Sequence, residues 1–398
     1  MGELSPFLLW TSGGHGSLVE RDFPVVRSAC LYLSILYYMN YFFELIRVAL
    51  EQRDCLSGIP NEEEWLELYE IANRQALTGV LYDGVLRLPA EQRPNDVFLL
   101  KWYGRVLKIE KQNKKMNDSC AVMTRKFQVD GRRHVILKGQ GVANLYPNPL
   151  HRISGDIDVW MEGERSDIVA YMKKRATIDH IVFHHLCVEL RNNVSVEVHF
   201  IPSMMYSYFS HRSLMRFFKR MSDVEFNNWV KIKDNGECLP ISTFSFNRVY
   251  LLVHIYRHLF AEGIGLRQLM DYYYLLKHGF TEAERLSALE DIKSLHMTKF
   301  LSAVMYVEQK VFGLPAENCL IAANEKEGEL LLSEVLLAGN FGKYDPRIQR
   351  GGELSLWERF IRPVKRNMRF ITSYPEEIIS APFFKIFHFC WLKFHGWI

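Results

Sequence analysis

The stretch that decides the fold lies in the middle of the chain, at residues 152–160, and reads RISGDIDVW. Alternate side chains of a β-strand share a face, so Asp156 and Asp158 are expected to project together. Ile157 and Val159 then face the core. Two neighbouring carboxylates repel each other unless a cation neutralises them, and Mg²⁺ is the usual partner of hard oxygen ligands. The alternative for an isolated Asp-x-Asp pair is a strand end with two solvated acids.

A short apolar strand at 134–137 precedes this stretch and ends at Lys138-Gly139-Gln140-Gly141, before a helical stretch from Val142 to Tyr146. Glycine lets the backbone approach a phosphate, and the N–H groups at a helix N-terminus favour anions. The pattern therefore indicates a phosphate-binding turn. The alternative is an ordinary turn.

A second alternating segment follows at 194–200, VSVEVHF. Glu197 shares a face with Ser195 and His199, whereas Val196 and Val198 face the core. One acid among valines is typical of a half-exposed edge strand. Because this segment follows the Asp-x-Asp strand, Glu197 is also a candidate third carboxylate of the same metal site.

Helical periodicity dominates both flanks, over residues 40–128 and from Thr243 onward. Between them, 167–175 is expected to be helical and 181–190 to be a strand. We therefore predict an α+β fold, a small mixed-sheet core flanked by N-terminal and C-terminal helical regions. The expected boundaries are 39–129 for the first helical region, 130–235 for the core and 236–398 for the second helical region. We expect residues 1–38 to be a non-native or dispensable extension with Met39 as the natural start, the alternative being a signal anchor.

Composition narrows the class of protein. The 398 residues carry 49 basic and 46 acidic side chains, a net charge of +3, which argues against a polybasic nucleic-acid binder and a highly charged disordered chain. The seven cysteines include no C-x-x-C pair, which argues against a zinc ribbon, a redox motif or a disulfide scaffold and favours a reducing cytoplasm. The uncharged N-terminal stretch 29–43 is shorter than the roughly 20 residues of a membrane span, so no stable span is expected.

Taken together, these motifs resemble a known family. Leu137-Lys138-Gly139, Leu145-Tyr146-Pro147, Pro149, Arg152, Asp156 and Asp158 follow its pattern, as do Val196-Glu197-Val198-His199 and the later 254–258 and 265–271. The family is the uncharacterised bacterial nucleotidyltransferases of NTP-transferase type 5, in the DNA polymerase beta-like superfamily. The resemblance implies the nucleotidyltransferase fold, a nucleoside triphosphate (NTP) such as ATP as substrate, and two divalent ions, Mg²⁺ or Mn²⁺.

The resemblance also implies roles for individual residues. Asp156 and Asp158 would hold the metal that bridges the triphosphate, and Glu197 would complete a second metal site that activates an acceptor hydroxyl. The nucleotide- and phosphate-binding candidates are Lys138, Gly139, Gln140, Gly141, Arg152 and Arg267. The turn has Gly-Gln where the superfamily usually has Gly-Ser or Gly-Gly, so Lys138 or Arg152 is expected to replace the seryl contact to phosphate.

Each cationic candidate has a purely structural alternative. These are a surface position at a strand end for Lys138, a salt bridge to an aspartate for Arg152, and a helix-surface ion pair with Asp271 for Arg267.

The function predicted from these features is metal-dependent transfer of a nucleotidyl group from an NTP to a hydroxyl acceptor, with release of pyrophosphate. The acceptor class stays open between a small molecule, a tRNA and a protein. The contrasting hypothesis is a catalytically inactive nucleotide-binding or partner-binding module with the same fold. A phosphohydrolase is a third option.

Four further features are interpreted as structural. For His254 and His258, four apart on a helix, a packing or pocket-wall role is favoured over zinc binding, and His184 and His185 are expected at ordinary strand-edge positions. A basic face on a C-terminal helix is expected to be solvated, with RNA or anionic lipid as the alternative partner: Arg362, Lys365, Arg366 and Arg369. The aromatic tail at 383–398 is expected to dock on the helical domain, the alternative being an amphipathic helix at a membrane interface.

Overall fold

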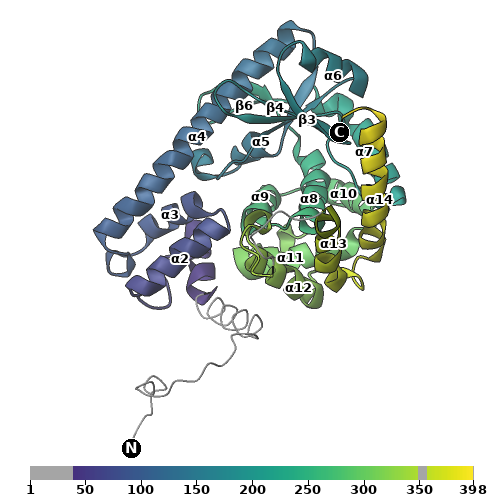
Figure 1. Cartoon of the computed structure of the whole chain (residues 1–398). Coiled ribbons are helices and arrows are strands. Elements are labelled where there is room, and N and C mark those ends of the chain that lie inside the picture. Colours follow the sequence, from purple (N-terminus) through teal and green to yellow (C-terminus); the bar gives the residue numbers. More distant parts are fainter. Residues whose placement is uncertain (1–38, 348–355, 398) are drawn as a thin grey trace, which may run out of the picture. The chain divides into compact units, whose positions relative to one another are not determined.

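The computed structural model describes residues 39–347 and 356–397 (Figure 1). The start predicted at Met39 concerns residues 1–38, which lie outside the described part of the chain. None of the helices in that part combines the length and hydrophobicity that crossing a bilayer requires. The boundaries predicted for the three regions remain predictions.

The N-terminal region is helical, as predicted. Residues 39–49 form a first helix, and α2 (Glu62–Arg74), α3 (Thr78–Arg87) and the long α4 (Asp96–Val129) follow, with a short 3-10 helix η1 (Ala90–Gln92) before α4. A capping box between Asn61 and Glu64 starts α2 by satisfying two backbone N–H groups. In Figure 1, α4 runs from α3 to the sheet, so this one helix belongs to both the helical region and the core.

The core contains a mixed five-stranded sheet of order β1-β2-β5-β4-β3. Its strands are β1 (His134–Leu137), β2 (Ile157–Met161), β3 (Ile178–Ile181), β4 (His185–Glu189) and β5 (Ser195–His199). The β2–β5 pair is parallel and the other neighbours are antiparallel. The edge-strand alternative for the Glu197 segment is wrong, because β5 is paired on both sides. The prediction that His184 and His185 occupy edge positions is wrong too, since His185 lies on β4, between β5 and β3, and His184 is buried just before it.

Further elements complete the core: α5 (Gly139–Ala143), η2 (Pro149–His151), α6 (Arg165–Lys173), α7 (Tyr208–Glu225) and a hairpin of β6 (Trp229–Lys231) and β7 (Cys238–Pro240). One face of the sheet is apolar: Ile157, Val159, Val196 and Val198 are buried in one cluster with residues of α4 and α6. This confirms the predicted alternation. The opposite face carries polar side chains, and Trp160 on that face packs against Phe246 of the next helical region.

The C-terminal region is helical, as predicted. It comprises α8 (Phe244–Ala261), α9 (Leu266–Lys277), α10 (Glu282–Ser294), α11 (Thr298–Phe312), α12 (Glu325–Ala338), α13 (Leu356–Asn367) and α14 (Pro375–Phe394), with η3 (Ala316–Asn318), η4 (Asn340–Gly342) and η5 (Met368–Phe370) between them. The architecture is thus the predicted α+β fold, with helical regions on both sides of a mixed sheet.

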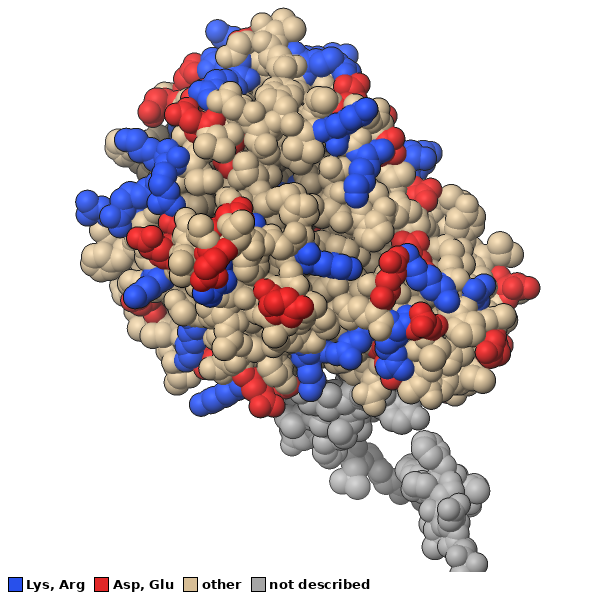
Figure 2. Space-filling model, turned by 180° about the vertical axis from the view of Figure 1, so that it is seen from behind, with Lys and Arg blue, Asp and Glu red and all other residues tan. Residues whose placement is uncertain are grey.

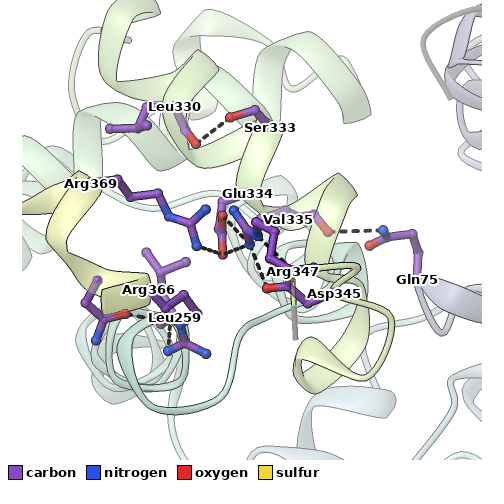
Figure 3. Close-up of polar contacts among 11 residues, drawn as sticks. Gln75, Leu259, Leu330, Ser333, Glu334, Val335, Asp345, Arg347, Arg366 and Arg369 are labelled. Carbon is purple, nitrogen blue, oxygen red and sulfur yellow. Dashed lines mark hydrogen bonds and ion pairs between the residues drawn. The ribbon is translucent and has the colours of Figure 1, made fainter. Parts of the chain in front are cut away.

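Two of the four basic residues predicted to form a solvated face on α13 and η5 bind groups of the protein instead. Arg366 donates to the carbonyl oxygen of Leu259 at 3.1 Å, and Arg369 forms an ion pair of 2.6 Å with Glu334 (Figure 3). Glu334 is only 3% exposed and also pairs with Arg347. The prediction of a solvated basic face is therefore wrong for Arg366 and Arg369, because a buried carboxylate and a helix-end carbonyl engage these guanidinium groups.

The aromatic tail packs against the core, a docking partner that the sequence did not predict. The backbone N–H of Phe183, in the turn between β3 and β4, donates to Nε2 of His388 at 3.1 Å, and the Phe183 ring contacts Trp391. The guanidinium of Arg165 lies 4.5 Å from the centre of the Trp391 ring, a cation–π contact. The sequence did not predict this partner, because the β3–β4 turn presents its aromatic ring to α14 only in the folded chain.

A buried carboxylate links α7 to α8 and makes stability depend on pH. Glu225 accepts hydrogen bonds from the backbone N–H and the hydroxyl of Thr243, which caps α8. Burial raises the pKa of Glu225 to about 7. Because the folded pKa lies above the unfolded value, this group stabilises the fold fully below pH 4.5 and loses that effect as pH rises through 7.

We therefore expect the free energy of unfolding of the wild type to fall relative to Glu225→Gln between pH 5 and pH 8, by on the order of 3 kcal/mol. Urea unfolding of both proteins at the two pH values measures this difference. A difference that does not change with pH would contradict the assignment.

Candidate functional site

Two carboxylates lie side by side on the polar face of the sheet. The parallel pairing of β2 and β5 sets Asp158 opposite Glu197, so both side chains point to the same face. Asp158 is only 1% exposed, whereas Glu197 is partly accessible. A buried acid next to a second acid requires compensating positive charge.

Lys138 and His199 supply that charge. The Lys138 Nζ atom lies 2.9 Å from Oδ1 of Asp158, and Nε2 of His199 lies 3.0 Å from the same oxygen and 3.4 Å from Oε2 of Glu197. The second Asp158 oxygen, Oδ2, is buried and has no hydrogen-bond partner among the described residues. The site thus holds an acid pair whose negative charge is only partly matched by hydrogen bonds.

The pKa shifts follow from these contacts. Burial acts to lower the pKa of His199, but hydrogen bonds to Asp158 and Glu197 outweigh it and the net shift is upward. Burial acts to raise the pKa of Glu197, yet the bond to His199 brings it below the usual range. Burial likewise opposes the charge on Lys138, whose pKa is raised by Asp158 and then by Asp156. The site therefore favours the charged forms of Glu197, His199 and Lys138.

The turn after β1 aims Lys138 at this site. Lys138 has φ 29° and ψ −142°, a conformation that L-residues rarely adopt, and Gly139 follows with φ 46°. A Cβ at residue 139 would meet only the Asp156 carbonyl oxygen, at 3.6 Å, so the positive φ and not lack of space calls for glycine there.

The other two turn residues have structural contacts. Gln140 is buried, and its Nε2 donates to Oδ1 of Asn117 on α4 at 2.6 Å. A Cβ on Gly141 would lie 3.3 Å from Ile241, so α5 packs closely there.

Asp156 lies near the acid pair but outside the strand. β2 begins at Ile157, so Asp156 precedes it and is partly exposed, and the prediction that one strand carries both aspartates holds only for Asp158. Its charge still acts on the pKa values of Lys138 and Glu197. Asp156 therefore belongs to the electrostatic surroundings of the pair.

Arg152 and Arg267 hold the backbone that leads into β2. Arg152 forms a two-point ion pair with Asp271 on α9, with N–O distances of 2.7 Å, and the Tyr146 hydroxyl donates to the same carboxylate at 2.7 Å. Arg267 donates to the Ile153 carbonyl oxygen at 2.7 Å. Asp271 is thus engaged by Arg152 and not by Arg267. The structure brings Lys138, Asp158 and Glu197 together. The two arginines instead bind Asp271 and the Ile153 carbonyl oxygen.

Several polar residues of the same face were not predicted as site residues. His185 on β4 pairs with His199 and has its Nε2 atom 3.5 Å from Oε1 of Glu197, and Cys187 pairs with Glu197. His184 is also buried and accepts a hydrogen bond from Arg257 of α8 at 3.0 Å. The alternating polar residues of 185–189 and 195–199 carried this signal, but the strand pairing that unites them is not visible in the sequence.

His254 faces this region from α8. Burial, and then Lys138, lowers its pKa well below the usual value. Its ring lies 4.3 Å from that of His258. These contacts agree with the packing role that the sequence favoured for the two histidines.

Within the described part of the chain, three groups of side chains have potential ligand atoms within 4.8 Å of one another. They are Asp158–Glu197–His199, His184–His185–His199 and His180–His185–Cys187. The first group contains the acid pair and the unpartnered Oδ2 atom, which fits a hard divalent cation.

A family match covers more than half of the chain. The sequence model of a family described as "Uncharacterised nucleotidyltransferase" matches residues 61–313. No curated protein matches the chain.

Solved structures give weak likenesses. An antigenic nucleotidyltransferase-like protein from Paracoccidioides brasiliensis matches 49% of this chain and 95% of its own, with 12% identity and a TM-score of 0.29. A CCA-adding enzyme from Thermotoga maritima complexed with tRNA matches 70% of this chain and 80% of its own, with 10% identity and a TM-score of 0.19. TM-scores this low support no conclusion about this chain.

Proposed function

The chain belongs to the uncharacterised nucleotidyltransferase family, and from that premise we propose that it transfers a nucleotidyl group from an NTP to a hydroxyl of an acceptor. The observation that carries the proposal is the pairing of Asp158 with Glu197 on adjacent strands, where two acids share one face with Lys138 and His199. A small molecule, a tRNA or a protein would supply the hydroxyl.

Metal dependence is part of the proposal. The ligands would be Asp156, Asp158 and Glu197, and the expected cofactor is two Mg²⁺ or Mn²⁺ ions. Divalent ions supply charge neutralisation of the triphosphate and activation of the acceptor hydroxyl. The buried, unpartnered Oδ2 of Asp158 supports a cation at this place.

The residues of the chain have the following proposed roles. Lys138 neutralises Asp158 when no metal is bound. With a divalent ion neutralising Asp158, the Lys138 amino group would contact a phosphate of the NTP. His199 keeps Asp158 and Glu197 oriented through its Nε2 contacts. Gly139, Gln140 and Gly141 offer backbone N–H groups to the triphosphate.

We assign Arg152 and Arg267 to positioning the segment before β2, because both guanidinium groups are bound to the protein itself. A direct contact of Arg152 with the nucleotide would require it to leave Asp271.

In the proposed reaction, the acceptor oxygen forms a bond with the α-phosphorus as the bond from that phosphorus to the β-phosphate oxygen breaks. Pyrophosphate leaves, and the acceptor hydroxyl gives up its proton to solvent. The charge that develops on the phosphate oxygens is stabilised by Lys138.

Position-specific labelling tests the proposal. The full chain is incubated with Mg²⁺, lysate components and each NTP labelled at the α-phosphate or, in parallel, at the γ-phosphate. We expect the α-label, and not the γ-label, to enter an acceptor, and Asp156→Asn/Asp158→Asn to give no transfer. Equal signals from wild type and variant would overturn the catalytic assignment. NTP binding without transfer would favour the inactive-module hypothesis, and release of free labelled phosphate would favour a phosphohydrolase.

Surface charge bears on the acceptor. Figure 2 shows basic and acidic side chains interspersed over one face of the molecule, in keeping with the net charge of +3. Such a surface suits a small acceptor, or a tRNA held at a local contact, better than a long nucleic acid. We further propose a cytoplasmic location, which is supported by the six described cysteines, all free thiols.

Lys138 provides a specific prediction. Lys138→Met removes the cation beside Asp158 and is expected to lower kcat by roughly 100-fold, with a rise in KM for the NTP, because charge on the transferring phosphate is no longer stabilised. Steady-state kinetics measure both constants. Lys173→Met, an exposed lysine on α6, is the matched control and should keep wild-type activity. Unchanged kinetics in Lys138→Met would contradict its role.

A further inference from the structure

We propose that this chain carries a further metal site, separate from the carboxylate site and with softer ligands, formed by His180, His185 and Cys187. The ligand atoms of these three side chains lie within 4.8 Å of one another on strands β3 and β4. The site would take Zn²⁺, or Co²⁺ as its substitute, and it is distinct from the carboxylate site proposed above.

The strand pairing builds this cluster. His185 and Cys187 are two residues apart on β4 and therefore share the polar face of the sheet. The register of β3 against β4 shifts between Ile178 and His180, so that His180 lies opposite Cys187. Without the shift, the Ile178–Val188 register would set His180 opposite Leu186, which is buried in the core. A bulge of this kind re-aims a side chain, and here it brings a third donor to the polar face.

The chemistry of the donors selects the ion. One thiol and two imidazoles suit Zn²⁺, whereas Mg²⁺ requires oxygen ligands. Three protein ligands leave a fourth position for water or another small ligand, as in catalytic zinc sites. His180 is exposed, while His185 and Cys187 are buried, so the ion can enter from the His180 side.

Neighbouring contacts favour this group over the other histidine group. Nδ1 of His180 lies 2.7 Å from Oδ2 of Asp179, the carboxylate–imidazole arrangement that orients metal-binding histidines, so we assign Nε2 as its ligand atom. In contrast, His184 accepts a hydrogen bond from the cationic Arg257, and His199 is bound to Asp158 and Glu197. The Nε2 atoms of those two imidazoles therefore already have partners.

Cobalt titration tests the site. The full-length chain is treated with a chelator, desalted under reducing conditions and titrated with Co²⁺ alone. We expect a thiolate-to-cobalt charge-transfer band that saturates at one ion per chain, is lost on adding Zn²⁺ and is unaffected by excess Mg²⁺. Asp158→Asn should keep this band, which separates the result from the proposed nucleotidyl transfer.

Two variants and a matched control make the test specific. Cys187→Ser should abolish the charge-transfer band, and His180→Ala, a change at an exposed residue, should weaken Co²⁺ binding by at least about 10-fold. Cys238→Ser alters an exposed thiol on β7 and should keep the band. A wild type without the band, or a band that persists in Cys187→Ser, would overturn the proposal.

Discussion

Asp158→Asn is expected to lower nucleotidyl transfer by on the order of 10³-fold or more while the chain stays folded. Asparagine has nearly the same shape, but it removes the negative charge that faces Lys138 and His199. Lys138 keeps electrostatic partners in Asp156 and Glu197, so the variant does not leave an isolated buried cation. The measurement is incorporation of α-labelled nucleotide at saturating NTP, together with circular dichroism to verify the fold.

A matched control separates charge at the site from charge elsewhere. Asp167→Asn removes an exposed aspartate of α6 that pairs with Arg132, and this variant should retain full activity. A second readout does not depend on turnover: the pKa of His199, raised by Asp158 and Glu197 against the effect of burial, should fall in Asp158→Asn. Nuclear magnetic resonance titration of the histidines measures it. Transfer within about tenfold of wild type would contradict the assignment of Asp158.

The sequence was sufficient for the local pattern around the acids. Alternation in 157–161 and 195–199 correctly separated the core residues from Asp158 and Glu197, because a strand with one buried face requires a period of two. It placed Asp156 on the same strand, but β2 begins one residue later. Strand ends depend on hydrogen bonding to neighbours, which the local pattern does not encode.

The missing part of the site depends on contacts between distant residues. His185 reaches Glu197 only because β4 pairs with β5, and the single-residue shift in β3 brings His180 beside Cys187. Neither the pairing partner of a strand nor a bulge follows from composition or periodicity. For the same reason, the ion pair suggested between Arg267 and Asp271, four residues apart on one helix, is replaced by a pair of Asp271 with Arg152, 119 residues distant. The salt bridge to an aspartate suggested for Arg152 is thus confirmed, but its partner could not be named from the sequence.

That long-range pair leads to the largest stability effect expected in this chain. The side chains of Arg152 and Asp271 are 5% and 7% exposed, and Asp271→Ala leaves the Arg152 guanidinium buried without its counter-ion. Removing one partner of a buried ion pair typically costs roughly 3–5 kcal/mol, so the free energy of unfolding should fall by about this amount. Urea unfolding measures it. The matched control, Asp167→Ala, breaks an exposed pair and should cost less than about 1 kcal/mol.

The double variant Arg152→Met/Asp271→Leu distinguishes a structural pair from a nucleotide-binding arginine. Replacing both charges with apolar side chains of similar size removes the unpaired cation, so the double variant should be more stable than Asp271→Ala, even though the Tyr146 hydroxyl loses its acceptor. If Arg152 also contacts the triphosphate, the double variant should in addition raise the KM for the NTP. A double variant as unstable as Asp271→Ala, combined with a raised KM, would therefore contradict the structural role of Arg152 and assign it to phosphate binding.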